Sequence, residues 1–406
     1  MKNPLLRISA EVLGLLSLVT TAGWSQSNQP AIVDQAVTYQ MNNTHTGIST
    51  TKGLVPPLAV KWSVNLNATV GYPLIADGKI FVLAGDSNSN EINLYALDPA
   101  TGATLWGPVL VPRGSYWWAA AAYDHGTIYV TPDGATVFGS GAMYAYDAAT
   151  GLMLWSATLD GQYLFNSPPT AANGYVYTGG AGGGGTVYAV SEANGGTLWT
   201  AGVANGNNSS PVVAGGGVYV SYVCPQVYKF AATSGKQLWH YDPGCDGGGG
   251  NTPVLFDGSL YVRDAILVQG FNGAIFNASN GTATANFNSL FAPTFWGKNG
   301  FYSESNSLTA FTVATGSTIW TAAPASGDSY ASAPIAVNGV IYIGTSEGTL
   351  LGYTSATGKL AVSLPMGAPI SAYDSDNYSS PTAGLAAANG LLLVPASTLL
   401  VALEHK

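Results

Sequence analysis

The sequence is poor in charged residues, and arginine is the scarcest of them. Only 8% of the 406 residues are charged, and arginine occurs only as Arg7, Arg113 and Arg263. No cluster of lysine and arginine exists, which excludes the basic surface that nucleic-acid binding requires. The acidic residues are spread along the chain, so the net charge of −9 favours solubility and indicates no particular partner.

The chain also lacks a hydrophobic run long enough to cross a membrane as a helix. The apolar run from Val12 to Ala22 is short, and it follows a start that carries Lys2 and Arg7. This order predicts a signal peptide over residues 1–25, and therefore a protein that is secreted or periplasmic, without a transmembrane anchor.

Cysteine occurs only at Cys224 and Cys245. An exported protein meets an oxidising environment, so we predict a disulfide between the two residues. Closing a loop of this size would stabilise the fold by about 3 kcal/mol through the entropy of the unfolded chain. Two unpaired thiols are the alternative.

A repeated motif of the form T/S/N-G-x-x-L/I-W is the most prominent feature that the sequence does contain. It ends at Trp106, Trp155, Trp199, Trp239 and Trp320. Degenerate copies surround Gly281 and Gly358, and successive motif glycines stand 35 to 49 residues apart. A period of this length indicates an array of one repeated structural unit.

Each repeat contains four short strand patterns. In one repeat they cover residues 166–173, 174–180, 186–191 and 195–199, with the alternation of a strand that buries one face. Asn-Gly, Asp-Gly and Gly-Gly pairs between the first two patterns indicate tight hairpins. Such hairpins recur eight times, near Asp77, His125, Asn173, Gly215, Asp257, Lys298, Asn338 and Asn389. We therefore predict an all-β, eight-bladed β-propeller of four-stranded antiparallel blades.

The last repeat stops after its third strand, at residues 398–404, and the missing fourth strand is available near the N-terminus. Residues 59–66 carry Trp62, which lies one repeat before Trp106. We expect this strand to complete the last blade and to leave no open edge. The chain then divides into the signal peptide, an entry segment over residues 26–58 and one propeller over residues 59–406.

The motif residues are expected to serve the scaffold. The glycine supplies the turn between the third and fourth strands, and the tryptophan packs between neighbouring blades. Asp98 and Asp147 precede two of these turns and are expected to shape them.

The stretches YALDPATGATLW and YAYDAATGLMLW resemble the PQQ-type propeller repeat. Residues 38–50 also resemble the entry segment of secreted PQQ-like repeat proteins. The family includes quinoprotein alcohol dehydrogenases and the propeller lipoprotein of the outer-membrane β-barrel assembly machine. The resemblance covers roughly residues 38–406 and implies the fold, but it leaves function open, because the same fold carries enzymes and binding scaffolds.

One face of the predicted propeller concentrates aromatic and amide side chains. It carries the loops that lead from each fourth strand to the next blade, and the loops between second and third strands. Such side chains suit sugars, flat cofactors or peptide segments, although aromatics there could also simply plug the channel. The candidate ligand-binding residues are Arg113, Tyr116, Trp117, Tyr163, Phe165, Asn166, Asn251, Arg263, Asp264, Tyr330, Asp376 and Tyr378.

Several of these candidates have a structural alternative. An arginine on this face could bind a carboxylate through two hydrogen bonds. Arg263 and Asp264 could equally be held by hydrogen bonds within their own loop. Two acids of this face could act as an acid/base pair, or all could be solvated. These acids are Asp160, Asp246, Asp328, Asp374 and Asp376. The four histidines show no metal-binding spacing, so no metal site is predicted from them.

The resemblance raises the question of a quinone cofactor. The resembling dehydrogenases place two adjacent cysteines beside the quinone and hold calcium with a Glu, an Asn and an Asp. This chain has no adjacent cysteines, and those ligands have no clear match. We therefore predict a monomeric binding scaffold for a protein segment or a carbohydrate. A PQQ-dependent alcohol or sugar dehydrogenase, carrying PQQ with Ca²⁺, is the alternative, followed by a carbohydrate-active enzyme.

Overall fold

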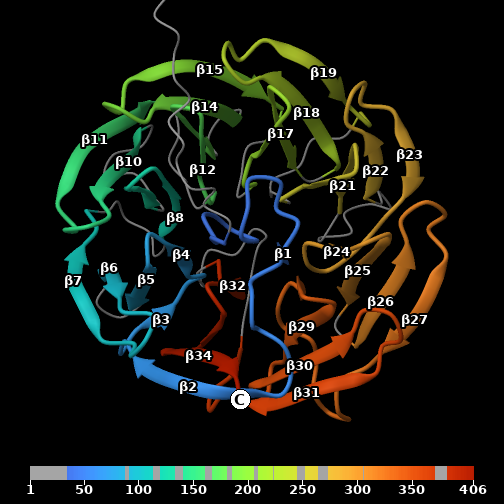
Figure 1. Ribbon diagram of the computed structural model, residues 1–406. Helices are drawn as coiled ribbons and strands as arrows, with labels where there is room; N and C mark the ends of the chain where they lie inside the picture. Colours follow the sequence, from blue (N-terminus) through green and yellow to red (C-terminus); the bar gives the residue numbers. More distant parts are fainter. Residues whose placement is uncertain are drawn as a thin grey trace, which may run out of the picture. The chain divides into compact units, whose positions relative to one another are not determined.

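The computed structural model describes residues 34–86, 91–112, 119–132, 140–160, 167–180, 185–204, 209–222, 224–244, 252–263, 273–304, 306–370 and 382–406. Within residues 34–406, eight small antiparallel sheets form a ring (Figure 1). The described residues contain no helix. The fold is an eight-bladed β-propeller, so the prediction from the repeats is confirmed.

Each blade has four strands, which follow one another from the centre of the ring to its rim (Figure 1). The innermost strands of blades 1 to 8 are β4 (Leu74–Ala76), β8 (Ala119–Asp124), β12 (Thr170–Ala172), β16 (Val212–Ala214), β20 (Val254–Phe256), β24 (Thr294–Trp296), β28 (Ile335–Val337) and β32 (Ala386–Ala388). The second strands are β5 (Lys79–Asp86), β9 (Thr127–Pro132), β13 (Tyr175–Gly180), β17 (Gly217–Tyr222), β21 (Ser259–Val262), β25 (Asn299–Glu304), β29 (Val340–Gly344) and β33 (Leu391–Ala396).

The third strands are β6 (Glu91–Leu97), β10 (Ser140–Asp147), β14 (Gly185–Ser191), β18 (Gln226–Ala231), β22 (Ala274–Asn277), β26 (Ser307–Thr312), β30 (Thr349–Thr354) and β34 (Leu399–His405). The outermost strands are β7 (Thr104–Leu110), β11 (Met153–Asp160), β15 (Thr197–Val203), β19 (Gln237–Tyr241), β23 (Ala283–Asn286), β27 (Thr318–Ala322), β31 (Leu360–Pro365) and β2 (Leu58–Asn65). Two short strands stand outside this pattern: β1 (Ile48–Ser49) pairs in parallel with β28, and β3 (Thr69–Val70) pairs with β5.

An N-terminal strand closes the ring. β2 pairs antiparallel with β34, from Leu58 opposite His405 to Asn65 opposite Leu399, and so completes blade 8. Lys61 on β2 forms an ion pair with Glu404 on β34. The predicted closure is thereby confirmed, and blade 8 has no missing strand.

The hairpins between first and second strands lie where the sequence predicted them. In every blade the first turn residue has a positive φ, which Asn, Asp and Gly adopt more readily than other residues. These residues are Asp77, His125, Asn173, Gly215, Asp257, Gly297, Asn338 and Asn389. The turns between third and fourth strands are shaped as expected too, because Asp98 and Asp147 accept hydrogen bonds from the main-chain N–H groups that follow them.

The tryptophans join neighbouring blades, and we call each such contact a seam. At six seams an indole ring lies so close to the motif glycine of the next blade that an added Cβ would approach it to 2.6–2.8 Å. The pairs are Trp62 with Gly102, Trp106 with Gly151, Trp155 with Gly195, Trp199 with Gly235, Trp239 with Gly281, and Trp320 with Gly358. The glycine is therefore required both by its positive φ and by this close approach.

Residues 34–54 occupy the middle of the ring and bond to all eight blades (Figure 1). The blade atoms belong to Ile75, Tyr123, Pro169, Val213, Leu255, Thr294, Ala336 and Ala387, which lie in or directly before the innermost strands. The described part of the entry segment therefore fills the channel and ties the blades together from inside.

Candidate functional site

Most residues of the predicted ligand face lie outside the described residues. These are Arg113, Tyr116, Trp117, Tyr163, Phe165, Asn166, Asn251, Asp264, Asp376 and Tyr378. Cys245 lies outside them as well, while Cys224 is buried just after β17. The disulfide and the role of these residues in ligand binding stay predictions.

The two described candidates, Arg263 and Tyr330, are buried within the propeller. Arg263 is 1% exposed, and its Nη1 donates a hydrogen bond of 2.8 Å to the carbonyl of Leu290. Tyr330 is 2% exposed and shares a hydrogen bond of 2.9 Å with the hydroxyl of Tyr353. Each contact stabilises a different loop that leads from one blade into the next: Arg263 bonds the loop before β24, and Tyr330 lies in the loop before β28. Ligand binding by either residue stays a prediction.

The loop acid Asp328 is also held by its surroundings. Its carboxylate accepts hydrogen bonds from the Ser329 N–H at 2.8 Å, the Ser346 hydroxyl at 3.0 Å and the Glu347 N–H at 3.1 Å. These bonds stabilise the turn in which the acid stands. Asp160, the other described acid of the predicted set, ends β11 in blade 2, whereas Asp328 lies in the loop between blades 6 and 7.

His45 is buried in the filled channel and contacts three blades. Its Nδ1 lies 3.2 Å from the carbonyl oxygen of Pro253, and its Nε2 lies 3.2 Å from Ser210 Oγ and 3.5 Å from Thr170 Oγ1. A carbonyl can only accept, so Nδ1 carries the proton of the neutral ring. Burial lowers the pKa of His45 to about 4, against the opposing effect of the Pro253 hydrogen bond.

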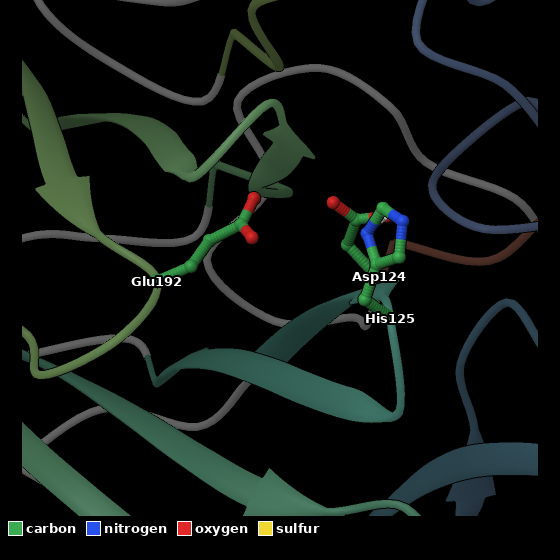
Figure 2. Close-up of side chains that lie close together, drawn as sticks. All are labelled: Asp124, His125 and Glu192. Carbon is green, nitrogen blue, oxygen red and sulfur yellow. Dashed lines mark ion pairs between the residues drawn. The ribbon is translucent and has the colours of Figure 1, made fainter. Parts of the chain in front are cut away.

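Asp124, His125 and Glu192 form a cluster on the opposite face, where two turns of blades 2 and 3 meet. Figure 2 shows the Glu192 carboxyl group pointing from its turn towards the other two side chains. One ligand-type atom from each residue lies within 4.8 Å of the others, and His125 Nδ1 lies 2.9 Å from Asp124 Oδ1. Among the described residues, this is the one grouping of His, Cys, Asp and Glu that could hold a cation.

Burial and charge repulsion both act on the acids of this cluster. Burial, followed by the nearby charge of Asp124, raises the pKa of Glu192 to about 7. Asp124 Oδ2 and Glu192 Oε1 are both buried and receive no hydrogen bond from a protein donor. A single proton held between the two carboxyl groups would satisfy both oxygens. This cluster could not be predicted from the sequence, because Glu192 is distant along the chain from the other two residues.

A cleft of about 600 Å³ opens at the seam between blades 5 and 6. Ala285 pairs with Ile275 at the position where Trp239 pairs with Lys229 in blade 4, so blade 5 has alanine in place of the motif tryptophan. The cleft is lined by Asp257, Ser259, Tyr261, Ile275, Thr284, Ala285, Asn286, Phe287, Asn288, Tyr302, Phe311, Val313, Ala314, Thr315 and Gly316. Its volume falls within the about 300–1,000 Å³ of ligand sites.

The seam between blades 7 and 8 also lacks the tryptophan, but there the space is filled. Val362 stands at the motif position, paired with Gly352, and its side chain is buried in the hydrophobic core. Ala285, in contrast, is exposed. The degenerate copy SNGTATA was visible in the sequence, and it marks the cleft, but the sequence alone did not show which of the two degenerate seams would open.

The described residues do not fit the quinone and calcium that the family resemblance implies. The polar side chains at the inner ends of the blades are already used: Thr170 and Ser210 donate to carbonyls and contact His45, and Thr294 donates to the carbonyls of Thr46 and Gly47. The acid cluster lies on turns at the opposite face, between blades 2 and 3. Gln40 Oε1 and Asn43 Oδ1 are buried in the channel without a hydrogen-bond partner, but no group of three acidic, histidine or cysteine ligands stands with them among the described residues.

Comparison with known proteins supports the propeller family. A family model described as outer membrane protein assembly factor BamB matches residues 90–185 and 183–398. No curated protein matches the chain. No helix among the described residues is long and apolar enough to cross a membrane.

Solved structures share the fold at low sequence identity. BamB from Moraxella catarrhalis is 14% identical, with a TM-score of 0.60 over 86% of this chain and 98% of its own. Quinohemoprotein alcohol dehydrogenase from Comamonas testosteroni is 15% identical, with a TM-score of 0.63 over 91% and 80%. The computationally designed Ika8 protein is 13% identical, with a TM-score of 0.60 over 84% and 98%. Such likeness shows the fold alone.

Proposed function

This chain belongs to the family of the outer membrane protein assembly factor BamB, and from that premise we propose that it is an exported scaffold that binds a segment of another protein. Export rests on the predicted signal peptide over residues 1–25, so the site of action is the periplasm or the cell exterior. The propeller supplies a rigid frame, and binding takes place at its surface.

The cleft between blades 5 and 6 is the observation that carries this proposal. It combines four aromatic side chains with six polar or charged ones, a mixture that suits a peptide segment with both apolar and polar groups. It also adjoins β23, a strand of four residues at the rim, all of them exposed. The outer edge of such a strand offers main-chain groups to an extended peptide, which is a common mode of peptide recognition.

A quinoprotein dehydrogenase is the second candidate, because a dehydrogenase is among the similar structures. That likeness is one of fold, and the channel donors described above are bonded within the protein. A carbohydrate ligand at the predicted aromatic face is the third candidate. The three differ in what they bind and in whether anything is turned over.

The test is a comparison of three assays on the purified mature chain, residues 26–406. We expect a random peptide library to yield peptides that bind in the micromolar range or tighter. We expect no reduction of an artificial electron acceptor with PQQ, Ca²⁺ and a panel of alcohols and sugars. Acceptor reduction, or glycan-array binding without any peptide ligand, would overturn the protein-binding proposal.

A further inference from the structure

The six seams that contain a tryptophan show in detail what this propeller places at a motif position. In each of them the indole N–H donates a hydrogen bond to a main-chain carbonyl of the next blade. This carbonyl belongs to the residue that lies three positions before the motif glycine. The acceptors are Pro99, Ala148, Glu192, Ala232, Ala278 and Ser355, at 2.7–3.2 Å. Each seam thus provides a flat apolar space with one hydrogen-bond acceptor at its edge.

The seam between blades 5 and 6 keeps these features without the indole. The corresponding glycine is Gly316, where an added Cβ would meet nothing within 4 Å, and the corresponding carbonyl belongs to Val313. Both residues line the cleft. The motif position itself is occupied by the methyl group of Ala285, which is far too small to fill the space.

The aromatic neighbours of the missing ring are also present. At the seam between blades 3 and 4, Trp199 packs against Tyr177 of its own blade at 5.9 Å and Phe230 of the next blade at 6.3 Å, measured between ring centroids. Tyr261 and Phe311 hold the same places beside the cleft, and their own centroids are 6.3 Å apart. The buried ring of Phe287 packs on both of them, at 5.4 Å from Tyr261 and 6.3 Å from Phe311 between centroids, and it lines the cleft as well. An indole entering above Gly316 would therefore meet three rings already in position.

We propose that this cleft is a socket for a tryptophan side chain presented by the bound protein segment. The inference rests on the proposed function and specifies its partner: an extended segment whose indole takes the place that the propeller leaves empty at Ala285. The indole N–H donates to the Val313 carbonyl, and the ring packs on Tyr261 and Phe311. Burial of such a side chain removes on the order of 200 Å² from water, which suits a dominant contact of an interface.

The socket is reached from the rim of the ring, beside β23. Thr284, Ala285 and Asn286 on this strand are exposed, and they line the cleft. Nothing among the described cleft residues carries a positive charge, so the site does not select for an acidic segment. The site recognises an aromatic ring of the ligand together with one N–H donor.

The decisive variant is Ala285→Trp, which supplies the missing indole from within the chain. We expect it to fold, to melt at a higher temperature than wild type because a cavity is filled, and to lose peptide affinity by about tenfold or more. Ala285→Ser leaves the socket open and should bind as wild type does. Leu238→Trp adds an indole at an exposed position on the outer strand of blade 4 and should bind normally as well.

A small probe tests the socket directly on the wild-type chain. N-acetyl-5-fluorotryptophan amide, observed by fluorine NMR, should broaden and shift with wild type and remain unchanged with Ala285→Trp. The 1-methyl analogue lacks the N–H and should bind more weakly, while N-acetylleucine amide should not compete. Equal signals with wild type and Ala285→Trp would overturn the inference, even if that variant were poorly folded in other respects.

The outcomes separate this inference from the proposed function. If library peptides bind but show no enrichment of tryptophan and tolerate Ala285→Trp, the scaffold function stands and the socket is rejected. If no peptide binds while acceptor reduction occurs, the proposed function itself fails. If wild type self-associates and Ala285→Trp is monomeric, the occupant is a second copy of this chain, and the partner proposal is overturned.

Discussion

The Trp155 indole N–H donates a hydrogen bond of 2.9 Å to the main-chain carbonyl of Glu192, across the seam between blades 2 and 3. The same residue directs its carboxyl group towards Asp124 on blade 2 (Figure 2). One residue of blade 3 therefore contacts blade 2 in two ways. The main-chain contact is independent of pH, and the side-chain contact changes with ionisation.

Replacing Trp155 with phenylalanine should weaken this seam. Trp155→Phe keeps an aromatic ring but removes the N–H donor, which contributes about 0.5–1.5 kcal/mol, together with part of the packing on Gly195. We expect a free energy of unfolding lower by about 1–3 kcal/mol, measured by urea denaturation. Leu154→Ala changes an exposed neighbour and should have little effect. An unchanged midpoint for Trp155→Phe would show that the seam does not depend on the indole.

Two glycines in the same kind of turn allow the indole contact to be separated from backbone strain. Gly281 and Gly316 have φ values of 74° and 70°, so alanine at either position pays a similar cost of about 1–2 kcal/mol. Only at Gly281 would the new Cβ also lie 2.7 Å from Trp239. Overpacking of this kind costs about 1–3 kcal/mol, so Gly281→Ala should be less stable than Gly316→Ala by that amount. Equal denaturation midpoints would contradict the presence of an open socket at Gly316.

The sequence was sufficient for the fold because the determinants of a blade are local. Hairpin residues such as Asp77 and Asn338 adopt their positive φ within a few residues of chain. The motif tryptophan and glycine recur with a regular period, so the pairing of neighbouring blades follows from their order. Even the long-range closure by β2 was predictable, because Trp62 stands one repeat before Trp106.

The candidate sites were harder to predict because they depend on side-chain volume and on distant turns. Ala285 and Val362 both replace a tryptophan, yet only Ala285 leaves a cleft. The difference depends on whether neighbouring side chains can fill the gap, which a motif does not encode. Asp124 and Glu192 lie close together only because their two blades are neighbours in the ring. No spacing in the sequence indicates that contact.

The buried His45 predicts a loss of stability in acid. Its pKa falls from 6.5 to about 4 on folding, chiefly through burial, so the unfolded chain binds a proton more readily than the folded one. The contribution of the neutral His45 ring to the free energy of unfolding is complete above pH 6.5. It is lost as the pH falls towards 4, by about 3 kcal/mol in total. His45→Asn retains a residue that tolerates the positive φ of 57° and removes the titration. The difference in unfolding free energy between wild type and variant should therefore shrink from pH 7.5 to pH 4.5, and a constant difference would rule the mechanism out.

Glu192 predicts a change of the opposite sign in the same pH range. Its pKa rises from 4.5 to about 7 on folding, so the folded protein holds the proton more tightly than the unfolded chain. Stability from this group is fully present below pH 4.5 and is lost as the pH rises through 7, where two neighbouring carboxylates must both be charged. Glu192→Gln keeps the size of the side chain and the carbonyl that accepts the Trp155 N–H, but it cannot ionise.

We expect Glu192→Gln to gain stability relative to wild type as the pH is raised from 5 to 8, when melting temperatures are compared in EDTA. Asp328→Asn, at an acid that is not part of the cluster, should show no such gain over that range, because its ordinary pKa lies well below it. If Glu192→Gln and wild type keep the same difference at pH 5 and pH 8, the two carboxyl groups do not share a proton. The main-chain bond from Trp155 would then be the contact through which Glu192 holds blades 2 and 3 together.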